Sequence, residues 1–360
     1  HLAGALGKPV WLMLPMAGDY RWLSGRDDSP WYPTMRLFRQ ERQGEWGEVV
    51  ERLRAALIVA VADFLERRLA THPLDGGSHY LMGAFLAAAG KPGEATVRFT
   101  KAAQLLPRQW QPHYALAQAL QQQGRFAEAR ASIEDALALE QVVPQLHEGL
   151  GIVRQVLGDF EGAQQSYREA LRLDPALAKA RYNLGTTLKE LGRFTEALAE
   201  FREAVHRSPG YADAHWNLAV LLLMTGQLPE GWREFSWRFQ KSSQAPQRRW
   251  QEFPAWDGGP LSGRTILLYG EQGAGDTLQF VRYAPLVIAR GGRVLIEVQS
   301  PSLVPLVRTV AGVAAVFASG DSLPPFELQA SLMDLPAIFE TDLAGIPAHI
   351  PYLHADAARA

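Results

Sequence analysis

The chain has 360 residues and no cysteine. This absence excludes disulfide bonds, thiolate metal sites and a cysteine nucleophile, but it leaves the cellular compartment open. An excess of one charge is also missing: the formal net charge is −2, so nucleic acid and anionic membranes are not expected as partners. The longest suspicious apolar run, LIVAVA from Leu57 to Ala62, is far shorter than the ~18 residues of a membrane span. We therefore predict a globular, cytoplasmic protein of two or three domains without a membrane span.

A metal-binding pattern is missing as well. The nine histidines are scattered, and none has the partner spacing and carboxylate that zinc sites use. We predict neither a metal nor a cofactor.

What the chain does contain is an internal repeat with a period of 34 residues and no insertion. Each block has a small residue at its eighth place, glycine at its fifteenth, alanine or glycine at its twentieth, and an aromatic or branched residue at its twenty-fourth. Small residues let two helices approach closely, and glycine can end a helix in the left-handed conformation. The pattern predicts helix–turn–helix units. The blocks begin at Gly76, Trp110, Pro144, Ala178 and Ala212.

The block AKARYNLGTTLKELGRFTEALAEFREAVHRSPG resembles the tetratricopeptide repeat. This resemblance implies an all-α superhelix over residues 57–243, with a half-repeat before residue 76 and a groove that holds a protein or peptide. The groove-facing places would be the second, fifth, sixth, ninth, twelfth and thirteenth. A solvated helix face with ordinary aromatic packing explains the same residues and is the preferred alternative. The candidate groove residues are Tyr114, Tyr182, Asn183, Trp216 and Asn217.

The stretch WREFSWRFQK, from Trp232 to Lys241, interleaves aromatic and basic residues. Such interleaving occurs in nucleic-acid binding proteins. The stretch also has the phase of the second helix of the last repeat, so we favour a terminal unit whose aromatic side chains cover the end of the array.

Both ends of the chain alternate strand and helix patterns. After a linker over residues 244–262, TILLYG, RVLIEV and AAVFAS predict parallel strands, with FELQAS and IPYL as later candidates and a helix from Asp276 to Arg290. Near the start, PVWLMLP predicts a buried strand and MRLFRQ a second one. About 55 residues bury too little surface to fold alone as such a sheet.

The glycine-rich stretch EQGAGDTLQF, from Glu271 to Phe280, joins a predicted strand to a predicted helix. It is not a P-loop, because no G-K-[ST] follows. Its glycines also have the wrong spacing for the dinucleotide fingerprint.

Both ends resemble bacterial tetratricopeptide proteins that carry a heptosyltransferase-like GT-B glycosyltransferase domain. The similarity lies in WQEFPAWDGGPLSGRTILLYGEQGAGDTLQFVRYAPL, HLAGALGKPVWLMLP and RDDSPWYPTMRLFRQ. It implies that residues 1–56 are the C-terminal piece of one such domain and residues 263–360 the N-terminal, Rossmann-like half of another. We expect a fragment of a longer protein with tandem modules, in which half of the catalytic cleft is absent.

The same resemblance suggests site residues. Asp276 would be the base that takes the acceptor hydroxyl proton, although an aspartate before a helix is also a common N-cap. His1 would lie near the donor phosphates, unless its position only reflects truncation or helix capping. The acceptor-side loop would contain Glu271, Gln272, Gly273, Gly275 and Thr277.

Two functions from different classes follow. In the first, the parent protein transfers a sugar from a nucleotide-sugar donor to a protein or glycan acceptor, while this chain alone is inactive. In the second, the protein is a non-catalytic scaffold for protein–protein interaction, with degenerate transferase domains.

Overall fold

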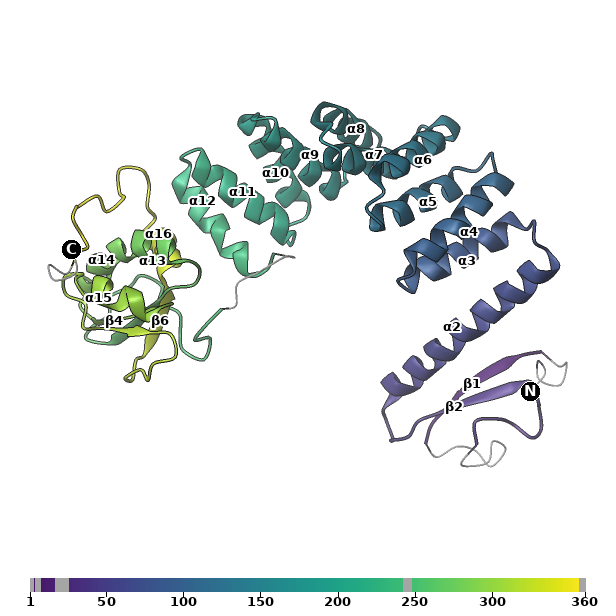
Figure 1. The fold of residues 1–360 in the computed structure, drawn as a ribbon. Coiled ribbons are helices and arrows are strands. Elements are labelled where there is room, and N and C mark those ends of the chain that lie inside the picture. The colour runs from purple at the N-terminus through teal and green to yellow at the C-terminus, as the bar shows by residue number, and fades with distance from the viewer. Residues whose placement is uncertain (1–2, 4–7, 17–25, 242–247, 356–360) are drawn as a thin grey trace. The chain divides into compact units, whose positions relative to one another are not determined.

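The computed structural model describes residues 3, 8–16, 26–241 and 248–355. It divides into two compact units, His1–Gln141 and Val142–Ala360. The division falls near the end of the second 34-residue block, two residues before the third block begins, and each unit is described by itself. Figure 1 shows the elements in order along the chain.

Each predicted block forms a pair of helices (Figure 1). The first helix of each pair begins at the first residue of its block: α3 (Gly76–Ala88), α5 (Trp110–Gln122), α7 (Pro144–Val156), α9 (Ala178–Glu190) and α11 (Ala212–Met224). The second helices are α4 (Pro92–Leu105), α6 (Phe126–Leu139), α8 (Phe160–Leu173), α10 (Phe194–Arg207) and the shorter α12 (Leu228–Phe235). The helix–turn–helix prediction is confirmed.

The turn inside each pair depends on the glycine of the fifteenth place. All five of these glycines have positive φ angles, between 71° and 80°. In the fourth repeat the Arg193 N–H donates to the Leu188 carbonyl at 2.9 Å and the Gly192 N–H to the Lys189 carbonyl at 3.0 Å. These two bonds form the Schellman motif, which satisfies carbonyl groups at a helix end. The other four repeats contain the same pair of bonds.

The eighth and twenty-fourth places pack directly against each other in three repeats. A Cβ atom added to Gly185 would lie 2.8 Å from two ring atoms of Phe201, and one added to Gly151 would lie 2.6 Å from the Tyr167 ring. Gly83 stands in the same relation to Phe99. The glycine is therefore required by the ring that lies against it.

The N-terminal segment contains a two-stranded parallel sheet of β1 (Val10–Leu14) and β2 (Met35–Arg39). Of β1 only Leu14 is fully buried, so this strand is more exposed than its sequence predicts. One continuous helix, α2 (Trp46–Thr71), follows. The sequence analysis places a domain boundary after residue 56 and a half-repeat before residue 76, and this boundary falls inside α2. Residues 48–71 contain neither glycine nor proline, so the helix has no reason to end near residue 56.

The C-terminal segment is a four-stranded parallel sheet with the strand order β5-β4-β3-β6. Its strands are β3 (Thr265–Tyr269), β4 (Arg293–Val298), β5 (Ala315–Ala318) and β6 (Leu328–Ser331). Ile350–Leu353, a later strand candidate, forms no strand. Because β6 returns to the other side of β3, the topological switch point lies between β3 and β6. Doubly wound sheets take their ligands at such a point, at the carboxyl ends of the strands.

Short helices follow the strands of this sheet. The single helix predicted from Asp276 to Arg290 is divided into α13 (Ala274–Phe280), the 3-10 turn η3 (Val281–Tyr283) and α14 (Ala284–Ile288). Pro285 accounts for the division, because a proline within a helix removes a backbone donor and crowds the preceding turn. The other short helices are η4 (Pro301–Leu303), α15 (Val304–Val307), η5 (Leu332–Asp334) and α16 (Leu335–Ile338).

The last repeat shares a hydrophobic core with the sheet. Phe235 belongs to the same buried cluster as the strand residues Ile266 and Ile296. The Trp232 ring contacts the Phe280 ring edge-on, with centroids 5.7 Å apart. The aromatic residues of WREFSWRFQK therefore cover the end of the array, as the sequence predicts. No helix among the described residues is both long and apolar enough to cross a membrane.

Candidate functional site

Each unit contains a depression between consecutive first helices. In residues 142–360 it measures about 450 Å³ and lies on α7 and α9, and in residues 1–141 a depression of about 470 Å³ lies on α3 and α5. The two linings share five places of the repeat: the sixth, ninth, twelfth, thirteenth and twenty-fourth. Tyr80 and Ala119 line only the first of the two depressions in the chain, and Phe160 lines only the second. The first-helix members are Ile152, Gln155, Val156, Asn183 and Glu190 in one, and Tyr80, Ala84, Ala87, Ala115, Gln118, Ala119, Gln121 and Gln122 in the other.

The twenty-fourth place supplies an aromatic ring to each depression, Phe99 in one and Tyr167 in the other. Tyr167 is fully buried, and its hydroxyl donates to Gln155 Oε1 at 3.0 Å. The Thr187 hydroxyl donates to the same oxygen at 3.3 Å. These bonds hold the Gln155 amide in one orientation. This part of the wall of the depression is therefore in place without a ligand.

Among the predicted groove residues, Asn183 lines the depression of residues 142–360. Asn217, at the same place one repeat later, donates to the Tyr182 hydroxyl at 3.2 Å and to the Asp213 carbonyl at 3.0 Å. The ring of Tyr182 also contacts that of Tyr211, with centroids 5.0 Å apart. Asn217 and Tyr182 are thus already bonded to each other, which is the behaviour of ordinary packing at a helix face.

The other two predicted groove residues lie apart from these depressions. Tyr114 is half-buried and contacts Trp110 at 6.3 Å between ring centroids. Trp216 packs on Phe235 at 5.2 Å, and Lys241 lies over its ring at 4.9 Å. Trp216 thus contributes to the joint between the last repeat and the sheet.

Glu148 is a residue that the sequence analysis did not select. It occupies the fifth place of the third repeat, one turn before Ile152, and its Oε1 is buried without a hydrogen-bond partner. Burial raises the pKa of its carboxyl, and the charge of Lys179 opposes this rise. A glutamate at a place that holds Tyr or Trp in the other four repeats was the available sequence signal.

The structure gives the local geometry of the predicted acceptor-side loop after β3, and the role of this loop as an acceptor site stays a prediction. Asp276 is the third residue of α13 and its Oδ2 accepts from the Gly273 N–H at 3.1 Å, so it caps the helix from inside rather than as the N-cap residue. Thr277 is buried and donates to Gln299 Oε1 at 2.8 Å. Gln272 and Gly275 are exposed, with open space where a Cβ of residue 275 would lie.

Glu271 is bound within the protein. Its carboxylate receives two hydrogen bonds from Arg238, at 2.9 and 2.5 Å, and the guanidinium also donates to Asp334 Oδ1 at 2.7 Å. Arg238 is 0% exposed and lies between the rings of Phe235 and Phe239, at 4.9 and 4.0 Å. Since Glu271 follows β3 and Asp334 follows β6, an arginine of the last repeat occupies the switch point of the sheet.

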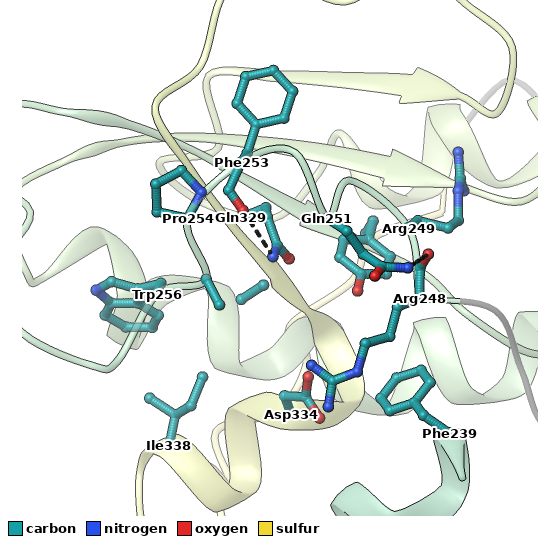
Figure 2. A pocket seen from close by; sticks show the side chains of 13 residues that line it. Phe239, Arg248, Arg249, Gln251, Phe253, Pro254, Trp256, Gln329, Asp334 and Ile338 are labelled. Atoms are coloured by element: carbon teal, nitrogen blue, oxygen red, sulfur yellow. Dashed lines mark hydrogen bonds between the residues drawn. The ribbon is translucent and has the colours of Figure 1, made fainter. Parts of the chain in front are cut away.

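One member of this ion triad, Asp334, lines a pocket of about 360 Å³. Figure 2 shows the side chains that line this pocket. Asp334 and Arg248 face each other across it, and Arg248 lies over the Phe239 ring at 4.5 Å. Arg249, also in its wall, is paired with the buried Glu297 at 2.6 Å. Burial raises the pKa of Tyr269, another wall residue, to about 12, so its hydroxyl is neutral at physiological pH.

Two predictions concern residues or groups that this geometry does not address. His1 lies outside the described residues, so its predicted place near donor phosphates stays a prediction. Within the described parts of the chain, no three histidine, aspartate or glutamate side chains gather in an arrangement that could hold a metal ion.

Comparison with known proteins identifies the repeats. The sequence model of the tetratricopeptide repeat matches residues 114–178, 149–211 and 182–231. Similar solved structures include MamA (18% identity, 43% of this chain and 91% of that chain covered, TM-score 0.42) and YrrB, described as a TPR protein with an unusual peptide-binding site (20%, 51% and 94%, 0.44). The APC/C hetero-tetramer Cut9-Hcn1 is also similar (21%, 53% and 38%, 0.45). No curated protein sequence matches.

These comparisons give no support to a glycosyltransferase domain. A four-stranded parallel sheet does not supply that support either, because sheets of this kind carry many unrelated functions. The assignment that stands rests on the sequence match and on the repeated helix pairs with their glycine turns: residues 114–231 are tetratricopeptide repeats.

Proposed function

We propose that the protein is a non-catalytic scaffold whose repeats bind an extended segment of a partner protein along the first helices. One observation carries this proposal: each unit has a depression of similar volume, and the two linings share five places of the repeat. Each depression lies between two consecutive first helices, where an extended segment of a partner can lie against both.

The chemistry of the two depressions supports a peptide rather than a small molecule. Their walls combine apolar side chains with amide groups, namely glutamines in one and Gln155 and Asn183 in the other. Amides can both donate to and accept from a peptide backbone, independently of its sequence. Because the helices are already packed, binding would order the partner and not the repeats.

The proposal is tested by displaying a library of random peptides and selecting those that bind the immobilised chain of residues 1–360. Val156 lines the depression and is 55% exposed, so an arginine there should fill the space without disturbing the core. We expect Val156→Arg to weaken selected peptides at least tenfold. Val97→Arg is the matched control, because Val97 is 67% exposed on a second helix.

If no peptide is selected, or if both arginine variants bind the selected peptides as tightly as the wild type, the depression is not the binding surface. Binding that disappears in both variants would instead indicate a general loss of folding, which circular dichroism detects.

Sugar transfer by a longer parent protein stays a prediction from resemblance, and so does the base role of Asp276. No feature of the described residues favours it over the scaffold function, and the switch point of the sheet is filled by Arg238. Calorimetric titration of the parent with nucleotide-sugars tests this prediction directly. A measurable heat of donor binding would support the transferase function over the scaffold function.

A further inference from the structure

Glu148 lies on α7, one of the two helices that form the depression between α7 and α9, and is not itself a lining residue. It is one helical turn from Ile152, which lines this depression, and it is close enough to Tyr167, another lining residue, to affect its ionisation. Glu190, at the thirteenth place of the next repeat, is also in the lining. Glu190 therefore gives this lining a carboxylate, with Glu148 one turn away from the lining residue Ile152, whereas the side chains that line the depression of residues 1–141 carry no charge.

The two carboxylates differ in their surroundings. Glu190 is exposed and lies 3.6 Å from the ammonium group of its neighbour Lys189. Glu148 is half-buried, and its Oε1 has no hydrogen-bond partner. A buried charged oxygen without a partner is costly, because the water that solvated it has been removed without replacement. Folding alone does not explain why a glutamate occupies this place.

The hydroxyls of Tyr167 and Tyr211 lie within electrostatic range of Glu148. Burial raises the pKa of the Tyr211 hydroxyl, and the charges of Asp213 and Glu148 add to the rise. Tyr211 is therefore within electrostatic range of Asp213 and of Glu148. Tyr182 packs on Tyr211. Carboxylates bind cationic groups directly, so Glu148 is the group of this region that would recognise such a ligand.

We infer that the peptide bound between the third and fourth repeats carries a lysine or arginine side chain, whose cationic group pairs with the Glu148 carboxylate. Rotation about the last side-chain torsion of a glutamate is easy, so either oxygen can turn toward the ligand. The inference rests on the proposed peptide binding and specifies its chemistry: a basic residue at one position of an otherwise permissive segment.

Lys179 is the main feature that argues for the opposite charge preference. It lies near Glu148, at the second place of the fourth repeat, and is exposed. A partly buried charge interacts more strongly than an exposed one, because solvent screens the exposed group. The buried carboxylate should therefore dominate, and selection of acidic peptides is the outcome that would contradict this reasoning.

The experiment uses the chain of residues 1–360 and peptides selected from the displayed random library, synthesised with acetylated and amidated ends so that the termini carry no charge. Each peptide is prepared with lysine or arginine at the selected position and with glutamine and glutamate in its place. Fluorescence anisotropy measures binding to the wild type, to Glu148→Gln and to the control Glu169→Gln. Glu169 lies on α8 and is paired with Arg172 at 2.7 Å.

We expect the lysine or arginine peptides to bind the wild type and Glu169→Gln at least tenfold more tightly than their glutamine versions. Glu148→Gln should bind all versions within about threefold of one another. Binding without a basic preference, or a preference that survives in Glu148→Gln, overturns the inference and leaves the peptide-binding proposal in place. Absence of any selected peptide overturns both.

Discussion

At the scale of single residues, Glu148 and Arg238 show opposite solutions for a charge away from water. Arg238 is fully buried, and both of its carboxylate partners are in place. Glu148 is half-buried, with one oxygen left unpaired. The first arrangement is that of a structural residue, and the second is that of a residue kept for a contact that the isolated protein does not make.

The raised pKa of Glu148 gives a prediction about stability. Its folded-state pKa lies above its usual value of 4.5, so the folded protein binds a proton there more tightly than the unfolded chain does. The stability from this group is present below pH 4.5 and is lost as the pH rises through the raised value. We expect Glu148→Gln to melt at a higher temperature than the wild type at pH 7, with a difference that shrinks below pH 4.5.

Differential scanning fluorimetry across pH 3.5–8 measures this difference. A lower melting temperature of Glu148→Gln at pH 7 would mean that the carboxylate has a stabilising partner in the folded state, and it would also weaken the argument for a cationic ligand.

At the scale of elements, the repeats show how two distant places are matched. Glycine at the eighth place lies against an aromatic ring at the twenty-fourth in three repeats, whereas the second repeat combines Ala117 with the smaller Ile133. The fifth repeat has Ala219 and Phe235, and here the twentieth place has changed from alanine to Gly231. The space between two helices is thus conserved, while the residues that fill it vary.

We therefore expect Gly185→Ala to destabilise its repeat by about 1–3 kcal/mol through overpacking against Phe201. The second substitution Phe201→Ile, which reproduces the pair of the second repeat, should recover part of this loss, so the two changes are not additive. Urea unfolding of the single and double variants measures the coupling. Gly210→Ala is the control, because a Cβ there meets nothing within 4 Å; equal effects at 185 and 210 would refute steric matching.

The helix pairs could be predicted from the sequence because their signals are local. Glycine turns recur at one place, and small residues recur where helices touch, so even the start of each first helix follows from the period. Signals that depend on distant partners were harder to use. Glu271 suggests a ligand loop in sequence, because its partner Arg238 is 33 residues away and cannot be identified before the chain is folded. The bond between Asp276 and the Gly273 N–H is local instead, so this capping role was within reach of the sequence.

At the scale of the whole molecule, the ion triad of Arg238, Glu271 and Asp334 joins segments separated by 33 and 96 residues. It lies beside the shared core of the last repeat and the sheet. Arg238 stands where most repeats have a small residue, and the sequence could mark it only as a departure from the pattern.

Arg238→Ala should destabilise the protein by about 3–5 kcal/mol, since it leaves the Glu271 carboxylate, 1% exposed, without its partner. Hydrogen exchange followed by mass spectrometry should show loss of protection in the last repeat and in residues 265–280 together. Arg202→Ala, which removes an exposed pair with Glu230, should cost at most about 1 kcal/mol. Loss of protection on only one side would show that the two segments are stabilised separately.

The triad also has a consequence for the order of events during synthesis. A ribosome releases Arg238 well before Glu271 and Asp334, yet chains begin to fold from the N-terminal side as they emerge. Until the sheet has been synthesised and has folded, the Arg238 guanidinium of the last repeat lacks its carboxylate partners, and Trp232 and Phe235 are exposed to solvent. Completion of the sheet is therefore the step at which the guanidinium gains its partners and these aromatic side chains leave the solvent.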